Sequence, residues 1–186
     1  YNCIDFVGIF ELQMEVAKNI AGEIEVIITP EEEERINTPP TDNLVAYDDF
    51  LKGLDLIYTF DREKVLEAIG YFEKAIEEDP EFARAHAAIT MAYYYLDEGQ
   101  AEKKYGEQIE YYGDKALLLD ATLPQSLIAK ALSYMHNREY ALAVPYLEKA
   151  LEYKPNYDLV YVYLIDIYVS HLPDTEKYLE YALRGL

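Results

Sequence analysis

Small and large apolar residues recur every three or four positions along most of the chain, which is the spacing of one face of an α-helix. The pattern is most regular between Pro124 and Tyr157, where it predicts two helices joined by a short turn. Pro155 ends the second helix, because a proline inside a helix removes a hydrogen bond and clashes with the preceding turn. The positions that share a face are Leu127, Ala131 and Tyr134 in the first helix, and Ala143, Leu147 and Ala150 in the second.

The same two-helix unit occurs on both sides of this stretch. The residues that repeat its spacing are Ala68, Phe72, Ala75 and Pro80 upstream, and Tyr161, Leu164 and Tyr168 downstream. The pattern therefore predicts four helix–turn–helix repeats, at about 44–81, 82–123, 124–157 and 158–186. In the second repeat, Gly113 stands where the others have a large side chain. We expect the packing of that repeat to be the weakest.

Turn and capping residues mark several helix ends. Thr122–Gln125 reads as a capping box with Pro124 in the first helical turn. Gly99 suits the left-handed backbone conformation that often follows a helix. The polar segment 100–107 fits either an extension of the next helix or a loop, and both alternatives stay open.

The repeated unit resembles the tetratricopeptide repeat (TPR), a helix–turn–helix motif of 34 residues that stacks into a right-handed superhelix. The resemblance implies an all-α fold, a TPR α-solenoid of about four repeats over residues 44–186. It also implies a function, because the first helices of stacked TPR hairpins line a concave groove that binds a segment of another protein.

Residues 1–43 are expected to form an N-terminal helix and linker before the repeats. Apolar residues at helical spacing from Phe6 to Ile24 predict a long amphipathic helix, and Val26 begins a β-branched run that suits a short strand. The segment is similar to the last helix of a bacterial TolB-like domain that runs into TPR repeats. The motifs that carry this resemblance are Ile9-Phe10-Glu11-Leu12-Gln13, Thr29-Pro30-Glu31-Glu32 and Pro40-Thr41-Asp42-Asn43. Proteins of that arrangement often have a nucleotide cyclase or a DNA-binding domain upstream.

Charge and composition exclude several classes of partner. The chain has 36 acidic and 16 basic residues, and its net charge of -20 repels nucleic acid and anionic lipid. A single cysteine, Cys3, fits a reducing compartment, and no apolar run is long enough to span a membrane. We expect a cytoplasmic location, or a periplasmic one if a transmembrane helix lies upstream. Because the sequence opens at Tyr1 in what reads as folded sequence, we interpret it as part of a longer protein.

Residues suited to catalysis or metal binding lack partners at the required spacing. His86, His136 and His171 lie far apart, and the chain has no glycine-rich phosphate loop or nucleophile elbow. We therefore expect no enzyme activity and no cofactor. Most of the 20 tyrosines fill repeat positions that need a large side chain, although Tyr94 and Tyr95 are less easily explained in this way.

The concave face of the repeats is predicted to bind a peptide or helix of a partner protein. Groove positions on a first helix fall at i, i+3, i+7 and i+10. They are Arg84, Ala87, Met91, Tyr94 and Tyr95 in the second repeat, Gln125, Ile128, Leu132, Met135 and His136 in the third, and Leu159, Val162, Asp166 and Val169 in the fourth. This face is apolar and aromatic. It therefore favours an apolar segment with basic flanks over an acidic tail.

Alternatives to an open groove remain. The groove could be filled by the N-terminal helix of the chain or by a second subunit. The apolar face of the last helix, at Leu179, Leu183 and Leu186, also has no partner in the sequence. A regulatory or oligomerisation segment of a larger bacterial signalling protein is therefore the second hypothesis, with a homo-oligomer formed through the N-terminal helix or the C-terminal face.

Overall fold

The computed structural model describes residues 12, 15–16, 18–20, 39–59 and 61–185. The chain divides into two compact units, Tyr1–Leu44 and Val45–Leu186. The described residues between 12 and 20 are helical. Most of the TolB-like segment and the strand expected near Val26 lie outside the described residues.

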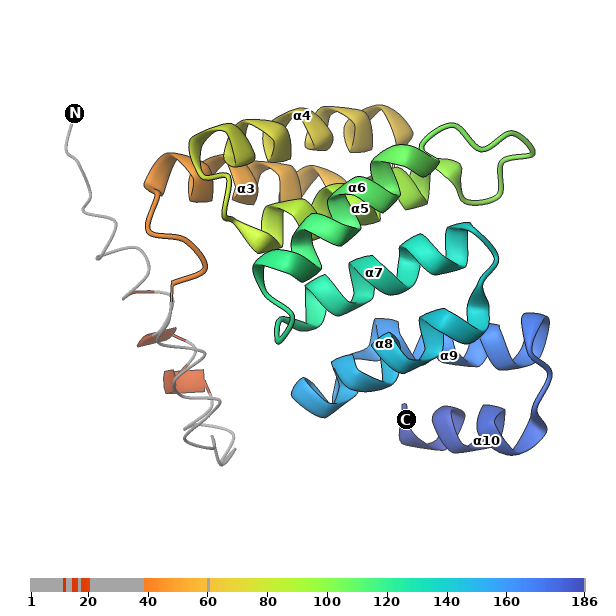
Figure 1. The fold of residues 1–186 in the computed structure, drawn as a ribbon. Helices are drawn as coiled ribbons and strands as arrows, with labels where there is room; N and C mark the ends of the chain where they lie inside the picture. The colour runs from red at the N-terminus through yellow and green to blue at the C-terminus, as the bar shows by residue number, and fades with distance from the viewer. Residues whose placement is uncertain (1–11, 13–14, 17, 21–38, 60, 186) are drawn as a thin grey trace. The chain divides into compact units, whose positions relative to one another are not determined.

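The described part of the second unit consists of four successive helical hairpins (Figure 1). The first three pair α3 (Leu44–Ile57) with α4 (Arg62–Glu78), α5 (Ala83–Asp97) with α6 (Gly106–Leu119), and α7 (Pro124–His136) with α8 (Tyr140–Tyr153). The fourth pairs α9 (Asp158–Asp166) with α10 (Thr175–Arg184), and α9 continues as the π-helical turn η1 (Ile167–His171). No strand occurs among the described residues. The all-α, TPR-like solenoid predicted from the spacing is confirmed.

Local signals explain some of the helix ends. Asp61 caps α4, since its carboxylate accepts from the backbone N–H groups of Glu63 and Lys64 at 3.0 and 3.1 Å. Gly99 follows α5 with φ at 70°, as predicted. The segment between α5 and α6 is a loop, which settles the alternative left open by its polar sequence.

The capping box predicted at the start of α7 is wrong. Pro124 is the first residue of α7, as expected, but the N-cap is Leu123, which makes no side-chain hydrogen bond. The hydroxyl of Thr122 donates to Asp120 Oδ1 at 2.7 Å. The same oxygen accepts from the backbone N–H of Leu123 at 3.1 Å. Asp120 therefore organises the turn before α7, but the groups it binds precede the helix, so it does not act as the N-cap expected of Thr122.

The core of the second unit has two main hydrophobic clusters and a small junction. The first cluster involves α3, α4 and α5, and the second involves α7 to α10. Between them, the buried residues Ala87, Ala116 and Ala129 connect α5, α6 and α7. A Cβ added to Gly113 would lie 3.1 Å from the carbonyl oxygen of Ala129. The backbone of α7 therefore occupies the space beside Gly113, and the expectation of weak packing there is wrong.

The close approach of α7 and α8 provides a test of the repeat register. Ala143 is fully buried in the second cluster. Replacing it with leucine should overpack the hairpin and lower the free energy of unfolding by about 1–3 kcal/mol, which thermal unfolding followed by circular dichroism can measure. The control is Ala141→Leu, at an exposed position of the same helix. Equal melting temperatures of both variants and the parent would show that the register is wrong.

Candidate protein-binding face

The predicted groove residues lie on α5, α7 and α9, the first helices of three successive hairpins (Figure 1). The exception is Val169, which lies on η1, the continuation of α9. On α7 the apolar members Ile128, Leu132 and Met135 are buried in the second cluster. On α5 and α9 most predicted positions keep some exposure, with Ala87 as the buried exception. The partly exposed or exposed members are Arg84, Met91, Tyr94, Tyr95, Leu159, Val162 and Asp166. On this face, the side chains of α5 and α9 are therefore more exposed than the apolar side chains of α7.

Two tyrosines from α5 and α9 meet on this side of the stack. The ring centroids of Tyr94 and Tyr163 are 6.5 Å apart, in an edge-to-face arrangement at 82°. Both rings pack against the cluster that contains Ile128 and Leu132. Burial raises the pKa of both phenols well above the ordinary value, so both stay neutral. The chain's own tyrosines therefore provide part of the cover over the second cluster.

Tyr163 was not among the predicted groove residues. Counting from Leu159 in steps of three and seven selected Val162 and Asp166, which are both exposed. Tyr163 lies four positions after Leu159, and residues at i+4 share a helix face as much as those at i+3 do. Inclusion of i+4 positions would have found it.

Arg84 lies at the start of α5 and is partly buried. Its guanidinium lies near Tyr47, Asp120 and Tyr157, but it forms no hydrogen bond or ion pair with any residue the structure describes. Burial lowers the pKa of Arg84, yet a guanidinium remains charged at neutral pH. Its donors are therefore available to a carbonyl or carboxylate of a ligand. We use the name inner face for Arg84, Met91, Tyr94, Tyr157 and Tyr163.

His136, predicted to face the groove, is held by a buried carboxylate instead. Its Nε2 atom donates to Asp97 Oδ2 at 2.9 Å, and the two side chains are 7% and 2% exposed. Asp97 also accepts from the backbone N–H groups of Lys104 and Tyr105 at 2.9–3.0 Å. Burial opposes the charge of Asp97, but these hydrogen bonds outweigh it and hold the pKa of the carboxyl below its ordinary value. The pair therefore attaches the α5–α6 loop to the end of α7.

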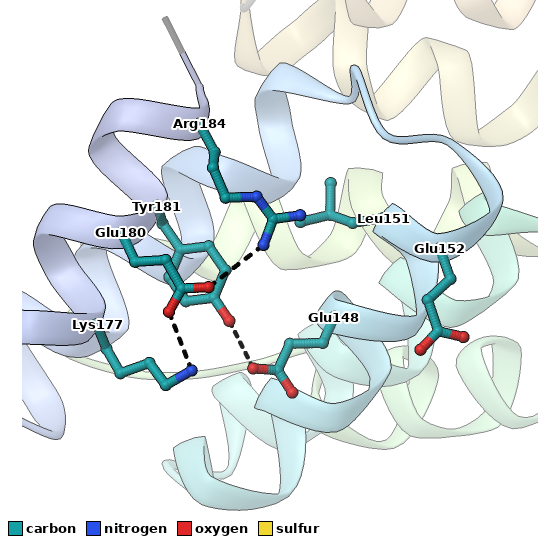
Figure 2. Close-up of a pocket in the computed structure, with 7 residues that line it drawn as sticks. All are labelled: Glu148, Leu151, Glu152, Lys177, Glu180, Tyr181 and Arg184. Atoms are coloured by element: carbon teal, nitrogen blue, oxygen red, sulfur yellow. Dashed lines mark hydrogen bonds and ion pairs between the residues drawn. The ribbon is translucent and has the colours of Figure 1, made fainter.

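A pocket of about 300 Å³ lies between α8 and α10 (Figure 2). The hydroxyl of Tyr181 donates to Glu148 at 2.5 Å. The carboxylate of Glu180 pairs with Lys177 at 3.2 Å and with Arg184 at 3.4 Å. The ion pairs of Glu180 lie within α10, and the bond from Tyr181 to Glu148 joins α10 to α8.

The three histidines lie in separate environments. His86 is buried, with Nε2 3.1 Å from the carbonyl oxygen of Pro80, and His171 stacks on Tyr140 with ring centroids 3.7 Å apart. Among the described residues, no three His, Cys, Asp or Glu side chains are grouped so as to hold a metal ion. A search of the same residues finds no helix with the length and apolarity needed to cross a membrane.

Stacked antiparallel hairpins with this spacing define a helical-repeat protein of the TPR-like type. No protein-family model matches the chain. Among curated proteins it is similar to response regulator aspartate phosphatase H of Bacillus subtilis (strain 168), with 33% identity over 129 residues. The match covers 64% of this chain and 33% of that protein, so the chain spans about a third of the length of its relative. The comparison gives no support to the TolB-like resemblance of the N-terminal segment.

Proposed function

We propose that this chain is the protein-binding repeat module of a bacterial regulatory protein and that it acts by binding rather than by catalysis. The similarity to response regulator aspartate phosphatase H supports a regulatory role, because the name of that protein says that it acts on another protein, a response regulator. The finer proposal is that the inner face binds a segment of the partner. It rests mainly on one observation, the unpaired guanidinium of Arg84 beside a row of partly buried rings.

The chemistry of the inner face indicates the kind of segment it would take. Met91, Tyr94 and Tyr163 offer apolar and aromatic surface to apolar side chains of a helix or extended peptide. Arg84 would donate to a main-chain carbonyl of that segment. With a net charge of -20 on the whole chain, basic residues at the ends of the segment are favoured and a run of acidic residues is disfavoured.

Calorimetry with two matched peptides tests this proposal. Both share one amphipathic core, and one has lysines at both ends where the other has glutamates. We expect the lysine peptide to bind at least about tenfold more tightly at moderate salt, because its flanks match the charge of the protein. Replacing Tyr94 with alanine should weaken its binding, whereas Tyr178→Ala, at a partly exposed position of α10 outside the inner face, should not. Tight binding of the glutamate peptide would overturn the proposal.

The alternative role is an oligomerisation segment of the same kind of regulatory protein. It is favoured by the side chains of Leu179 and Leu183 on α10, which are 49% and 71% exposed. Sedimentation equilibrium distinguishes the two roles. A dimer that strengthens with salt and dissociates on Leu183→Glu substitution would favour oligomerisation, because salt screens the repulsion between two acidic chains. A monomer at all salt concentrations would favour the binding module.

A further inference from the structure

A group of tyrosines lies where α4, α5 and α6 meet, away from the residues of the inner face. Tyr93 of α5 has its ring centroid 4.9 Å from that of Tyr105 and 6.3 Å from that of Tyr112, to which it is nearly parallel at 19°. Tyr111 packs edge-on against Tyr112 at 5.1 Å. Tyr93, Tyr105 and Tyr112 rest on the first hydrophobic cluster. We call Tyr93, Tyr105, Tyr111 and Tyr112 the tyrosine cluster.

The cluster keeps part of its surface in water and has a carboxylate beside it. Tyr111 is 56% exposed, and the other three rings are partly exposed. Burial, followed by the nearby charge of Glu73, raises the pKa of Tyr93 to about 12, and the same two causes raise the pKa of Tyr112. Glu73, on α4, is exposed. Neutral ring faces next to an anionic group form the environment that attracts an organic cation.

Other tyrosines of this chain already have such a cation from the chain itself. The ammonium of Lys74 lies 4.9 Å from the ring centroid of Tyr71, and Lys130 lies 4.5 Å from that of Tyr134. Lys154 lies 4.3 Å from the ring of Tyr157. These pairs show that lysine side chains readily settle over tyrosine rings in this protein.

The tyrosine cluster differs from those pairs. Within the described residues, no lysine or arginine lies over any of its four rings. Lys115 of α6 is close enough to His86 to lower the pKa of that histidine after burial has lowered it. The charge that acts on Tyr93 and Tyr112 is that of Glu73. The tyrosine cluster therefore has aromatic rings and a carboxylate, the groups that attract a cation, but no cation of the described chain lies over its rings.

We propose that the tyrosine cluster and Glu73 bind an arginine side chain of a partner protein. A planar guanidinium can stack on the tyrosine rings while it donates to the carboxylate, which an ammonium cannot do as well. The net charge of -20 draws a basic partner to this surface. The site uses α4 to α6 and no residue of the inner face, so it stands whether or not the inner face binds a peptide.

The test uses the whole chain and a capped peptide, Gly-Arg-Gly-Arg-Gly, with a twin in which citrulline replaces each arginine. Citrulline keeps the shape of arginine and removes its charge. Titration followed by NMR at moderate salt should show binding of the arginine peptide, with the twin roughly tenfold weaker or undetectable, because cation–π attraction and the contact with Glu73 are both lost. Equal binding of the two peptides would overturn the proposal.

Matched variants separate this site from general attraction to an acidic protein. Glu73→Gln should weaken binding roughly threefold, as expected for a partly exposed ion pair. Glu67→Gln removes the same charge from another exposed position of α4 and should leave binding unchanged. Equal losses in these two variants would show that only net charge matters and would refute the proposed site.

The rings are tested in the same titration. Tyr112→Leu should weaken binding roughly two- to fivefold, whereas Tyr112→Phe, which keeps the ring face, should retain it. Tyr94→Ala, on the inner face, should have no effect on this peptide. Loss of binding in the phenylalanine variant, or in Tyr94→Ala, would show that the arginine peptide binds elsewhere. Neither outcome changes what the calorimetric test says about peptide binding at the inner face.

Discussion

Replacing Asp97 with alanine is expected to lower the free energy of unfolding by about 3–5 kcal/mol, among the largest effects of any single change in this chain. The carboxylate is 2% exposed and bonds to the ring of His136 and to two backbone N–H groups of the loop before α6. Without it, the ring and both N–H groups lose their acceptor inside the protein. Urea unfolding followed by circular dichroism gives the difference.

The control for this variant is Asp55→Ala, at an exposed position of α3. It removes the same charge and should change the free energy of unfolding by less than about 0.5 kcal/mol. Comparable losses in the two variants would mean that net charge, and not the buried contacts of Asp97, determines the result.

Lowering the pH should reduce the contribution that Asp97 makes to the free energy of unfolding. Its pKa is lower in the folded protein than the value of about 3.9 for an unfolded chain. The folded state therefore gains stability from the ionised carboxylate above about pH 4, and this gain is lost as the pH falls toward the folded pKa. The difference in stability between the parent and Asp97→Asn should accordingly be smaller at pH 3 than at pH 7. A constant difference would contradict the assignment.

Phe72→Ala is expected to have a loss of similar size, about 3–5 kcal/mol, for a different physical reason. The ring is fully buried, lies 5.7 Å from that of Phe50, and occupies the space beside Gly53, where an added Cβ would lie 2.4 Å from the ring edge. Removing the ring leaves a cavity that the fixed backbones of α3 and α4 cannot close. Chemical unfolding monitored by circular dichroism measures the loss.

The neighbouring ring supplies the control for Phe72. Tyr71 is only partly buried and lies beneath Lys74, with the ammonium 4.9 Å from its centroid. Tyr71→Ala should therefore cost no more than about 1 kcal/mol, the contribution of an exposed cation–π contact. If both variants unfolded at the same urea concentration, Phe72 would not have the central position in the α3–α4 hairpin that the structure gives it.

The repeats were predictable because their spacing reflects a simple geometric need. Ala68, Ala75, Ala143 and Ala150 are all fully buried, and small residues at these intervals are what allow two helices to approach. Such positions leave a periodic trace in the sequence that does not depend on distant partners. The existence of the repeat helices and their order along the chain could therefore be predicted from this spacing.

The site was less predictable, because exposure depends on neighbouring hairpins. The spacing of Ile128 and Leu132 placed them on one side of α7, but it could not show that side chains of other helices pack over the cluster to which they belong. The bond between Asp97 and His136 joins residues 39 positions apart, and no local pattern marks Asp97 as its acceptor. Before α7, the hydroxyl of Thr122 bonds to Asp120 and not to the helix, a contact that the sequence rule for capping did not anticipate.

The contact between Tyr94 and Tyr163 has a consequence for folding kinetics. Each hairpin joins segments adjacent in sequence, so its formation has a low loop-closure cost and can be fast. The two tyrosines come from the second and the fourth hairpin, so their contact requires the intervening α7–α8 hairpin to be in place first. We expect it to form late and to open early under native conditions, without loss of the hairpins themselves. An opening of this kind would let a ligand of the proposed inner face replace the chain's own aromatic cover on a timescale shorter than global unfolding.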